Sequence, residues 1–144
     1  MGVDFNVIVE NIENAVFSKT LRYGRTIREL LERYDIDVEH VNYDGVVDED
    51  GSCIRIPEES IIPALKAARE ARDTAHEEYH TAMDAAMKME MEYSDDDGNR
   101  ELERAHRAVA VHSSNEATYG AFADMLNVTS ILQSLGKKVE MVAW

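Results

Sequence analysis

Residues 61–93 read IIPALKAAREARDTAHEEYHTAMDAAMKMEMEY, and this stretch decides the fold. After Pro63 it contains neither Gly nor Pro, and Pro63 falls in the first turn, where a helix tolerates proline. Apolar or small residues recur at alternating steps of four and three, a heptad spacing that predicts one long helix packed against another. The predicted seam consists of Ile61, Leu65, Ala68, Arg72, Ala75, Tyr79, Ala82, Ala86, Met89 and Tyr93, with Arg72 as its polar interruption.

A second helical stretch follows the turn-forming residues 94–99, SDDDGN. The Ser113–Glu116 capping box and Gly120 predict a break or kink within it, and Gly136 is expected to cap its end. The two stretches therefore predict an antiparallel helical hairpin over residues 58–135. A helix of about 36 residues spans about 54 Å, whereas a globule of this length measures roughly 37 Å across. We therefore expect the hairpin to protrude from the rest of the chain.

Apolar strips on a protruding hairpin favour association with another protein surface. We therefore expect a homo-oligomer that assembles through the hairpin. A second, adaptable strip of methionines, Met83, Met87 and Met91, lies beside the seam. The expected interface residues are Ile61, Leu65, Ala68, Ala75, Tyr79, Ala82, Met83, Ala86, Met87 and Met89. The alternative is that both strips fold back on the rest of the chain as ordinary core.

The N-terminal third alternates short β-type patterns with one helix. Residues 3–9 alternate apolar and polar side chains, which predicts a half-buried strand. Residues 15–22 fit a strand and a helix almost equally, and we favour the strand of a hairpin. Thr26 and Glu29 form a capping box that opens a short helix over residues 27–34. Further strands are predicted at residues 38–43 and 53–56, the second stopped by a proline and containing a single cysteine, Cys53, which we expect to be buried.

The segment TIRELLERYDIDVEHVNYDGVV, residues 26–47, resembles the ubiquitin-like β-grasp proteins that carry sulfur in thiamin and molybdopterin synthesis. In that family a Thr-capped helix with paired leucines leads into a strand that ends at a turn glycine. The segment GKKVEMV, residues 136–142, resembles the closing strand of the same fold. Sulfur carriers end in Gly-Gly, whereas Met141-Val142-Ala143-Trp144 stand here, so the resemblance implies the fold and protein binding but not carrier chemistry.

Together these patterns predict an α+β protein. A small β-grasp-like mixed sheet with one short helix would carry a long antiparallel helical hairpin inserted before the last strand. The expected division is a base of residues 1–57 plus 136–144 and a hairpin of residues 58–135.

The charge balance narrows the classes of partner. The chain has 144 residues with 29 Asp and Glu against 15 Lys and Arg, a net charge of −14. Such a field repels phosphate, so we expect no direct nucleic-acid binding, and it would suit a basic protein partner, a divalent cation or a high-salt cytoplasm. No apolar run approaches the ~20 residues of a membrane span, and residues 1–11 do not read as a signal peptide. We therefore expect a soluble cytoplasmic protein without membrane contact.

The leading functional hypothesis is a non-enzymatic, acidic protein-interaction or assembly module. Proteins of this kind include viral or mobile-element accessory factors, although a halophilic origin would give the same charge. We expect no catalytic residues, cofactor or resident metal. Two other hypotheses stay open. One is a small anionic-ligand binder that uses the basic cluster Arg22, Arg25 and Arg28.

The other hypothesis is a zinc-dependent hydrolase. His76-Glu77-Glu78-Tyr79-His80 matches H-E-x-x-H, in which two histidines one helical turn apart bind zinc and the glutamate acts as a general base. It resembles the zincin metallopeptidases. If the hairpin turns near residues 96–97, His112 and Glu116 lie level with His80 and His76. The candidate metal residues are His76, Glu77, His80, His112 and Glu116.

Overall fold

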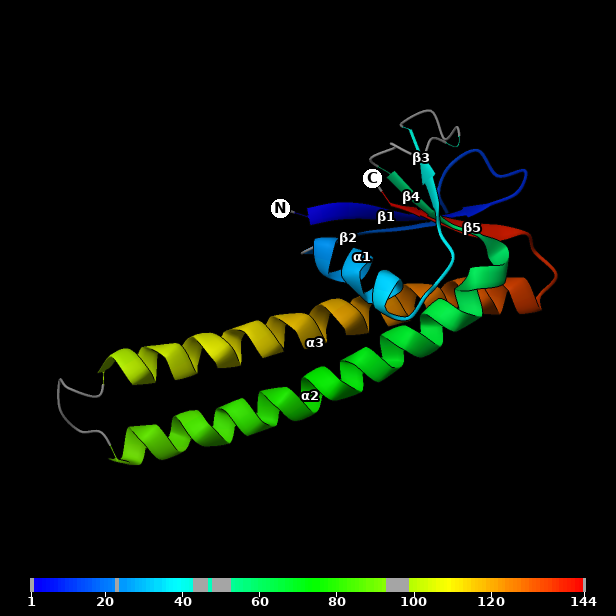
Figure 1. Cartoon of the computed structure of the whole chain (residues 1–144). Helices are drawn as coiled ribbons and strands as arrows, with labels where there is room; N and C mark the ends of the chain where they lie inside the picture. The colour runs from blue at the N-terminus through cyan, green and yellow to red at the C-terminus, as the bar shows by residue number, and fades with distance from the viewer. Residues whose placement is uncertain (1, 23, 43–46, 48–52, 93–98, 144) are drawn as a thin grey trace.

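The computed structural model describes residues 2–22, 24–42, 47, 53–92 and 99–143. It also leaves the side chains of Arg22, Arg25 and Asn99 outside the described set. The chain is α+β, with a five-stranded sheet, a short helix and a long helical hairpin, as the sequence predicts (Figure 1). The predicted turns at 44–45, 50–51 and 94–99 lie almost wholly outside the described residues.

The elements follow one another in the order that the sequence pattern predicts. The strands are β1 (Gly2–Val9), β2 (Phe17–Arg22), β3 (Glu39–Val41), β4 (Cys53–Ile56) and β5 (Val139–Ala143). The helices are α1 (Gly24–Arg33), a 3-10 turn η1 (Glu58–Ser60), α2 (Ile61–Glu92) and α3 (Asn99–Ser134). Residues 17–22 form a strand, which decides between the two readings of that segment in favour of the strand.

The sheet is antiparallel throughout, so the expected mixed sheet is wrong. Its strand order is β2-β1-β5-β4-β3, and all four neighbouring pairs run antiparallel. The direction of β5 is set by the helical hairpin that precedes it. The chain leaves the end of β4 through η1 and enters α2. Because α3 has a similar length and runs back along α2, the chain returns to the same end of the strands, where β5 begins. Because β4 ends where β5 starts, the two strands must run in opposite directions.

The main core lies between one face of the sheet and the helices. Phe5 and Met141 from the sheet are buried against Phe122 and Leu126 of α3 and Leu30 of α1. The rings of Phe5 and Phe122 lie 5.6 Å apart, centroid to centroid, and are tilted. The other face of the sheet carries a small cluster of Val41, Cys53 and Val142, with Ile8 packed against it, so Cys53 is buried as expected.

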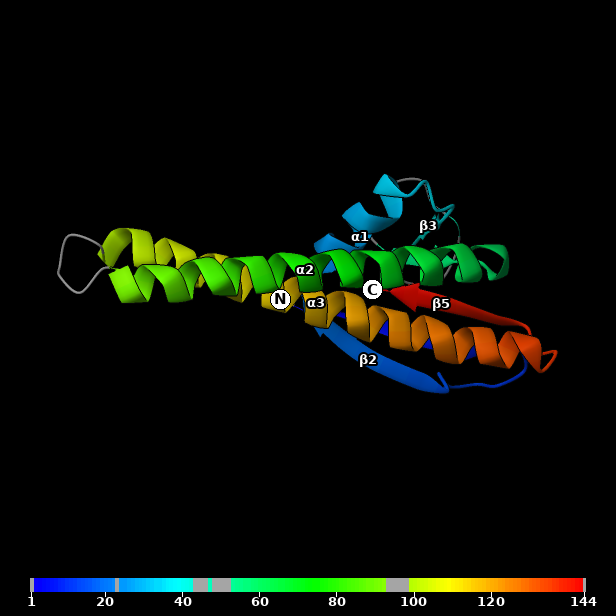
Figure 2. The same cartoon turned by 90° about the horizontal axis from the view of Figure 1, so that it is seen from below.

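The core does not follow the predicted division into base and hairpin. The main cluster joins residues of β1, β2, β4 and β5 to residues of all three α-helices. Figure 2 shows the sheet and α1 lying over one half of the hairpin, while the other half extends beyond them. We call the half near the sheet the proximal half and the half near the α2–α3 connection the distal half.

The expected break near residues 113–120 is wrong, because α3 runs without interruption from Asn99 to Ser134. The packing of α3 along α2 outweighs the capping preference of Ser113 and the low helix propensity of Gly120. At Gly120 the long side chain of Arg72 from α2 lies alongside, and a Cβ built there would meet its Cδ at 3.6 Å.

The end of α3 follows the prediction. Gly136 has a φ of 81°, in the left-handed region that favours glycine. Its N–H donates to the Gln133 carbonyl at 2.9 Å, and the N–H of Lys137 donates to the Leu132 carbonyl at 3.1 Å. These two hydrogen bonds are those of a Schellman motif, which satisfies the last carbonyls of the helix and turns the chain toward β5.

Substitution by alanine should have opposite effects on stability at Gly136 and at Gly120. We expect Gly136→Ala to lower the free energy of unfolding by about 1 kcal/mol, because alanine is strained at that φ. We expect Gly120→Ala to raise it by about 0.5–1 kcal/mol, because alanine favours the helix and its Cβ makes an ordinary contact. Urea unfolding followed by circular dichroism measures both. A change of the same sign in both variants would contradict the assignment.

Candidate functional site

The seam residues of α2 are used mainly for packing within the chain. Ile61, Leu65 and Ala68 belong to the main core, and Ala75 and Ala86 are buried farther along the helix. Four of the expected interface residues are half-buried, namely Tyr79, Ala82, Met83 and Met89. Met87 is 55% exposed. The surface open to a partner therefore lies beside the seam, not along it.

One such surface is an apolar groove between the two helices of the distal half. The groove has a volume of about 330 Å³. Small side chains make its floor, with Glu101 and Arg104 beside them. It is lined by Ala82, Ala85, Met89, Glu101, Arg104, Ala105 and Ala108. Sequence analysis missed Ala85 and Ala108. For Ala85 the available signal was its position directly beside the seam alanine Ala86.

The groove continues the hairpin face that is covered in the proximal half. Ala67 and Ala85 are 18 residues apart, which is about five turns of helix, so they point the same way from α2. Ala67 is buried, whereas Ala85 is exposed. On α3, Phe122 is buried against the sheet, and Val111, 11 residues before it and on nearly the same face, is 55% exposed. The core-forming face of the hairpin is therefore uncovered beyond the sheet.

The opposite side of α2 carries the two histidines of the H-E-x-x-H motif. Their Nε2 atoms lie 3.1 Å apart, and Nδ1 of His76 lies 2.7 Å from Oε1 of Glu116 on α3. The two rings meet nearly edge to face, with centroids 4.4 Å apart. All three side chains are at least partly open to solvent. His76 thus lies beside Glu116, which confirms the register predicted for these two residues of the hairpin.

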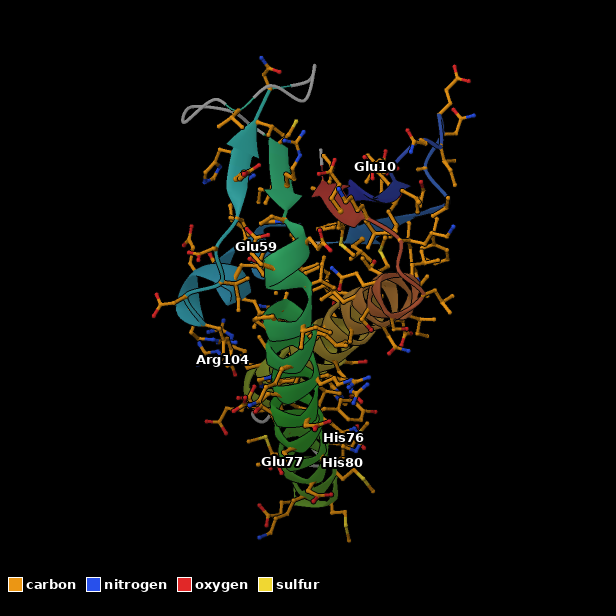
Figure 3. All side chains as sticks on the ribbon, turned by 90° about the vertical axis from the view of Figure 1, so that its right-hand side faces the viewer. Glu10, Glu59, His76, Glu77, His80 and Arg104 are labelled. Carbon is orange, nitrogen blue, oxygen red and sulfur yellow. The ribbon has the colours of Figure 1, made fainter. Side chains whose placement is uncertain are left out.

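The other hydrolase candidates do not join this pair. His112 lies with Glu78, its Nδ1 3.1 Å from the carboxylate, on the flank of α2 away from His76. Figure 3 shows Glu77, the expected general base, on the other side of the α2 ribbon from His76 and His80. In the described part of the chain, no group of three or more His, Cys, Asp or Glu side chains is placed to hold a metal ion. A three-ligand zinc centre with Glu77 as its base is thus not assembled by these residues.

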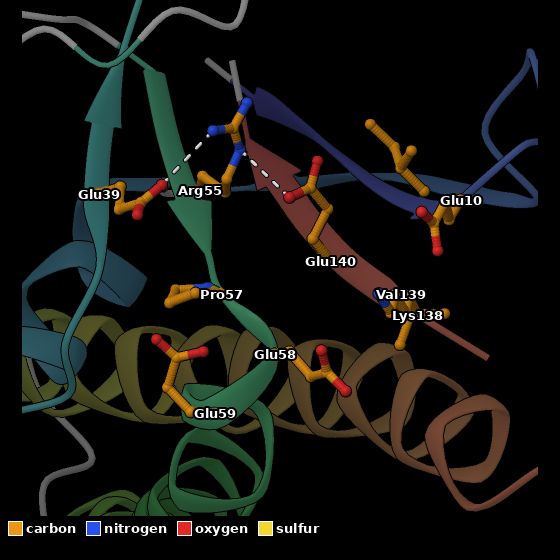
Figure 4. Close-up of a pocket in the computed structure, with 10 residues that line it drawn as sticks. Glu10, Glu39, Arg55, Pro57, Glu58, Glu59, Lys138, Val139 and Glu140 are labelled. Carbon is orange, nitrogen blue, oxygen red and sulfur yellow. Dashed lines mark hydrogen bonds and ion pairs between the residues drawn. The ribbon is translucent and has the colours of Figure 1, made fainter. Parts of the chain in front are cut away.

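A cleft of about 450 Å³ lies where β1, β4 and β5 meet η1 (Figure 4). Arg55 bridges two carboxylates there, with Nη1 3.4 Å from Glu39 and Nε 3.3 Å from Glu140. Five glutamates and two cations, Arg55 and Lys138, line the cleft. It is therefore acidic and unsuited to an anionic ligand. Of the predicted anion cluster, the side chains of Arg22 and Arg25 lie outside the described residues, and Arg28 is exposed.

Comparisons with known proteins add no assignment, since no family model, curated protein or solved structure matches this chain. The resemblance to sulfur carriers stays a prediction. Within the described ranges, no helix combines the length and apolar character that crossing a membrane requires.

The Arg55 bridge gives a measurable contribution to stability. Since Arg55 holds the charges of β3, β4 and β5 together, we expect Arg55→Met to lower the free energy of unfolding by about 1 kcal/mol. The loss should shrink in 1 M salt, which screens exposed pairs. Lys66→Met, at an exposed position of α2, is the control and should change stability by less than about 0.5 kcal/mol. Equal losses in the two variants would contradict the role of the bridge.

Proposed function

We propose that this protein is a non-enzymatic assembly module that forms a two-fold dimer through the groove side of its distal hairpin. The uncovered continuation of the core face, from Ala67 to Ala85 on α2 and from Phe122 to Val111 on α3, is the observation that carries the proposal. Two hairpins placed with these faces together form a four-helix bundle, which buries apolar side chains that one hairpin leaves in water.

The charges of the distal half favour a second copy as the occupant. Residues 77–92 of α2 carry five acidic side chains and one lysine, whereas residues 99–108 of α3 carry three arginines and two glutamates. A two-fold axis places α2 of one copy against α3 of the other, so the acidic helix meets the more basic one. At the groove itself, Arg104 of each copy would face acidic side chains of its partner.

Residues 77–108 carry ten acidic and four basic side chains, so the pairing of α2 with the partner's α3 has to offset a net charge of −6 on each distal half. A distal segment of about 14 residues is about 21 Å long. Overlap over that length leaves the two sheets at opposite ends of the bundle, where their mutual repulsion is screened within a Debye length of about 8 Å at physiological salt. The separation of the sheets therefore limits repulsion between the remaining net charges of −8 on the two copies.

A charge placed on the groove side should break the dimer. Ala85 is exposed and lines the groove, so Ala85→Arg leaves the α2–α3 contact intact but brings a cation toward the arginines of the partner's α3. An unpaired charge in an interface costs about 2 kcal/mol or more, which raises the dimer Kd about thirtyfold. Sedimentation equilibrium and native mass spectrometry of the untagged full chain measure this change.

Met87→Arg is the matched control. It adds the same charge to the same helix, but Met87 lies on the histidine side of α2 and does not line the groove. We expect this variant to remain a dimer. A monomeric wild type would overturn the proposal. Dimer loss in Met87→Arg but not in Ala85→Arg would also overturn it, because the interface would then lie on the methionine strip.

A further inference from the structure

We propose that His76 and His80 form a binding site for one divalent transition-metal ion, with both Nε2 atoms as ligands and Glu116 as the group that orients His76. The inference is independent of the proposed dimer. His76 and Ala85 are nine residues apart, which turns them about 180° from each other around α2. The site and the groove therefore occupy opposite sides of the hairpin.

The separation of the two nitrogens suits a shared ion. Imidazole nitrogens bind such ions at about 2.0–2.1 Å, so two of them on one ion lie about 2.9 Å apart at a right angle and about 3.3 Å apart in a tetrahedron. The observed 3.1 Å between Nε2 of His76 and Nε2 of His80 falls between these values. A spacing of i and i+4 on a rigid helix holds both rings on the same face without a loop to order.

Glu116 prepares His76 for this role. A carboxylate 2.7 Å from Nδ1 accepts the ring proton there, which leaves Nε2 as the lone-pair nitrogen. This is the carboxylate–histidine arrangement that fixes the tautomer and the ring orientation of metal-bound histidines. Since Glu116 belongs to α3, the ion would also couple the two helices of the hairpin.

The ligand chemistry defines the class of ion. Two neutral imidazoles suit Cu²⁺, Ni²⁺ and Zn²⁺, and affinity rises toward Cu²⁺ in the usual order. Water completes the coordination, since the rings are exposed and the His76 side chain is 53% accessible. For both Nε2 atoms to bind the ion, neither can carry a proton, so the ring proton of each histidine would lie on Nδ1.

The test is a titration of the untagged full chain with Cu²⁺ and, separately, Zn²⁺, by calorimetry and, for copper, by electron paramagnetic resonance. We expect one ion per chain, nitrogen hyperfine coupling from two imidazoles, and a thermal midpoint that rises with metal. His80→Ala should remove the stoichiometric binding, and Glu116→Gln should weaken it about tenfold. Circular dichroism checks that each variant keeps its helices.

His106→Ala is the matched control. His106 also contacts a carboxylate across the hairpin, with Nε2 2.9 Å from Glu90, but no other histidine of the described residues lies against its ring. We expect this variant to bind the ion like the wild type. Equal binding in wild type and His80→Ala would overturn the site, because surface carboxylates would then account for the binding. Equal loss in His80→Ala and His106→Ala would also overturn it, because the binding would then not depend specifically on the His76–His80 pair.

Discussion

The antiparallel packing of α2 on α3 is the constraint on which the rest of the structure depends. The two helices have 32 and 36 residues, so the chain returns to the end of the strands from which it left the sheet. This return places β5 between β1 and β4 and makes it run antiparallel to β4. It also carries Phe122 and Leu126 under the sheet, where they complete a core that the five short strands could not form alone.

The same packing explains why half of the hairpin is left without a cover. The sheet and α1 are shorter than the helices, so they bury only the proximal half of the hairpin's inner face. In that half, large side chains such as Leu65 and Phe122 fill the core. In the distal half the seam of α2 alternates alanines with Tyr79 and Met89, which are only half-buried, so this half buries little apolar area. A helix pair of this kind gains much from a second pair laid on its open face.

Sequence patterns predicted the elements well because each was a local property of a few residues. Heptad spacing and the cap at Gly136 both follow from neighbours within one or two turns. The expected start of the short helix at the Thr26–Glu29 capping box is wrong, because α1 runs from Gly24 to Arg33 and contains Thr26. The other errors arose where distant residues decide the outcome. The expected break at residues 113–120 does not occur, and at Gly120 the helix lies beside Arg72, which is 48 residues away in the sequence. The direction of β5 depended on the similar lengths of α2 and α3, which the pattern of β5 itself does not contain.

Of the two candidate sites, one could be predicted from the sequence and the other could not. The pairing of His76 with Glu116 could be predicted, because a hairpin with a known turn fixes which residues are level. The groove at Ala85 could not, since its exposure depends on where the sheet ends rather than on any property of α2 itself.

The distal half is held together by two kinds of interaction of different strength. Along its centre run alanines such as Ala75 and Ala86, and along its flanks run three contacts between a histidine and a glutamate of the facing helix, at His76, His106 and His112. Exposed pairs of this type contribute at most about 1 kcal/mol each. The distal half is therefore the less stable part of the fold, and anything that binds either flank adds a large fraction to its stability. Because the groove and the histidine pair lie on opposite flanks, a partner and a metal ion would stabilise the same two helices without competing for the same side chains.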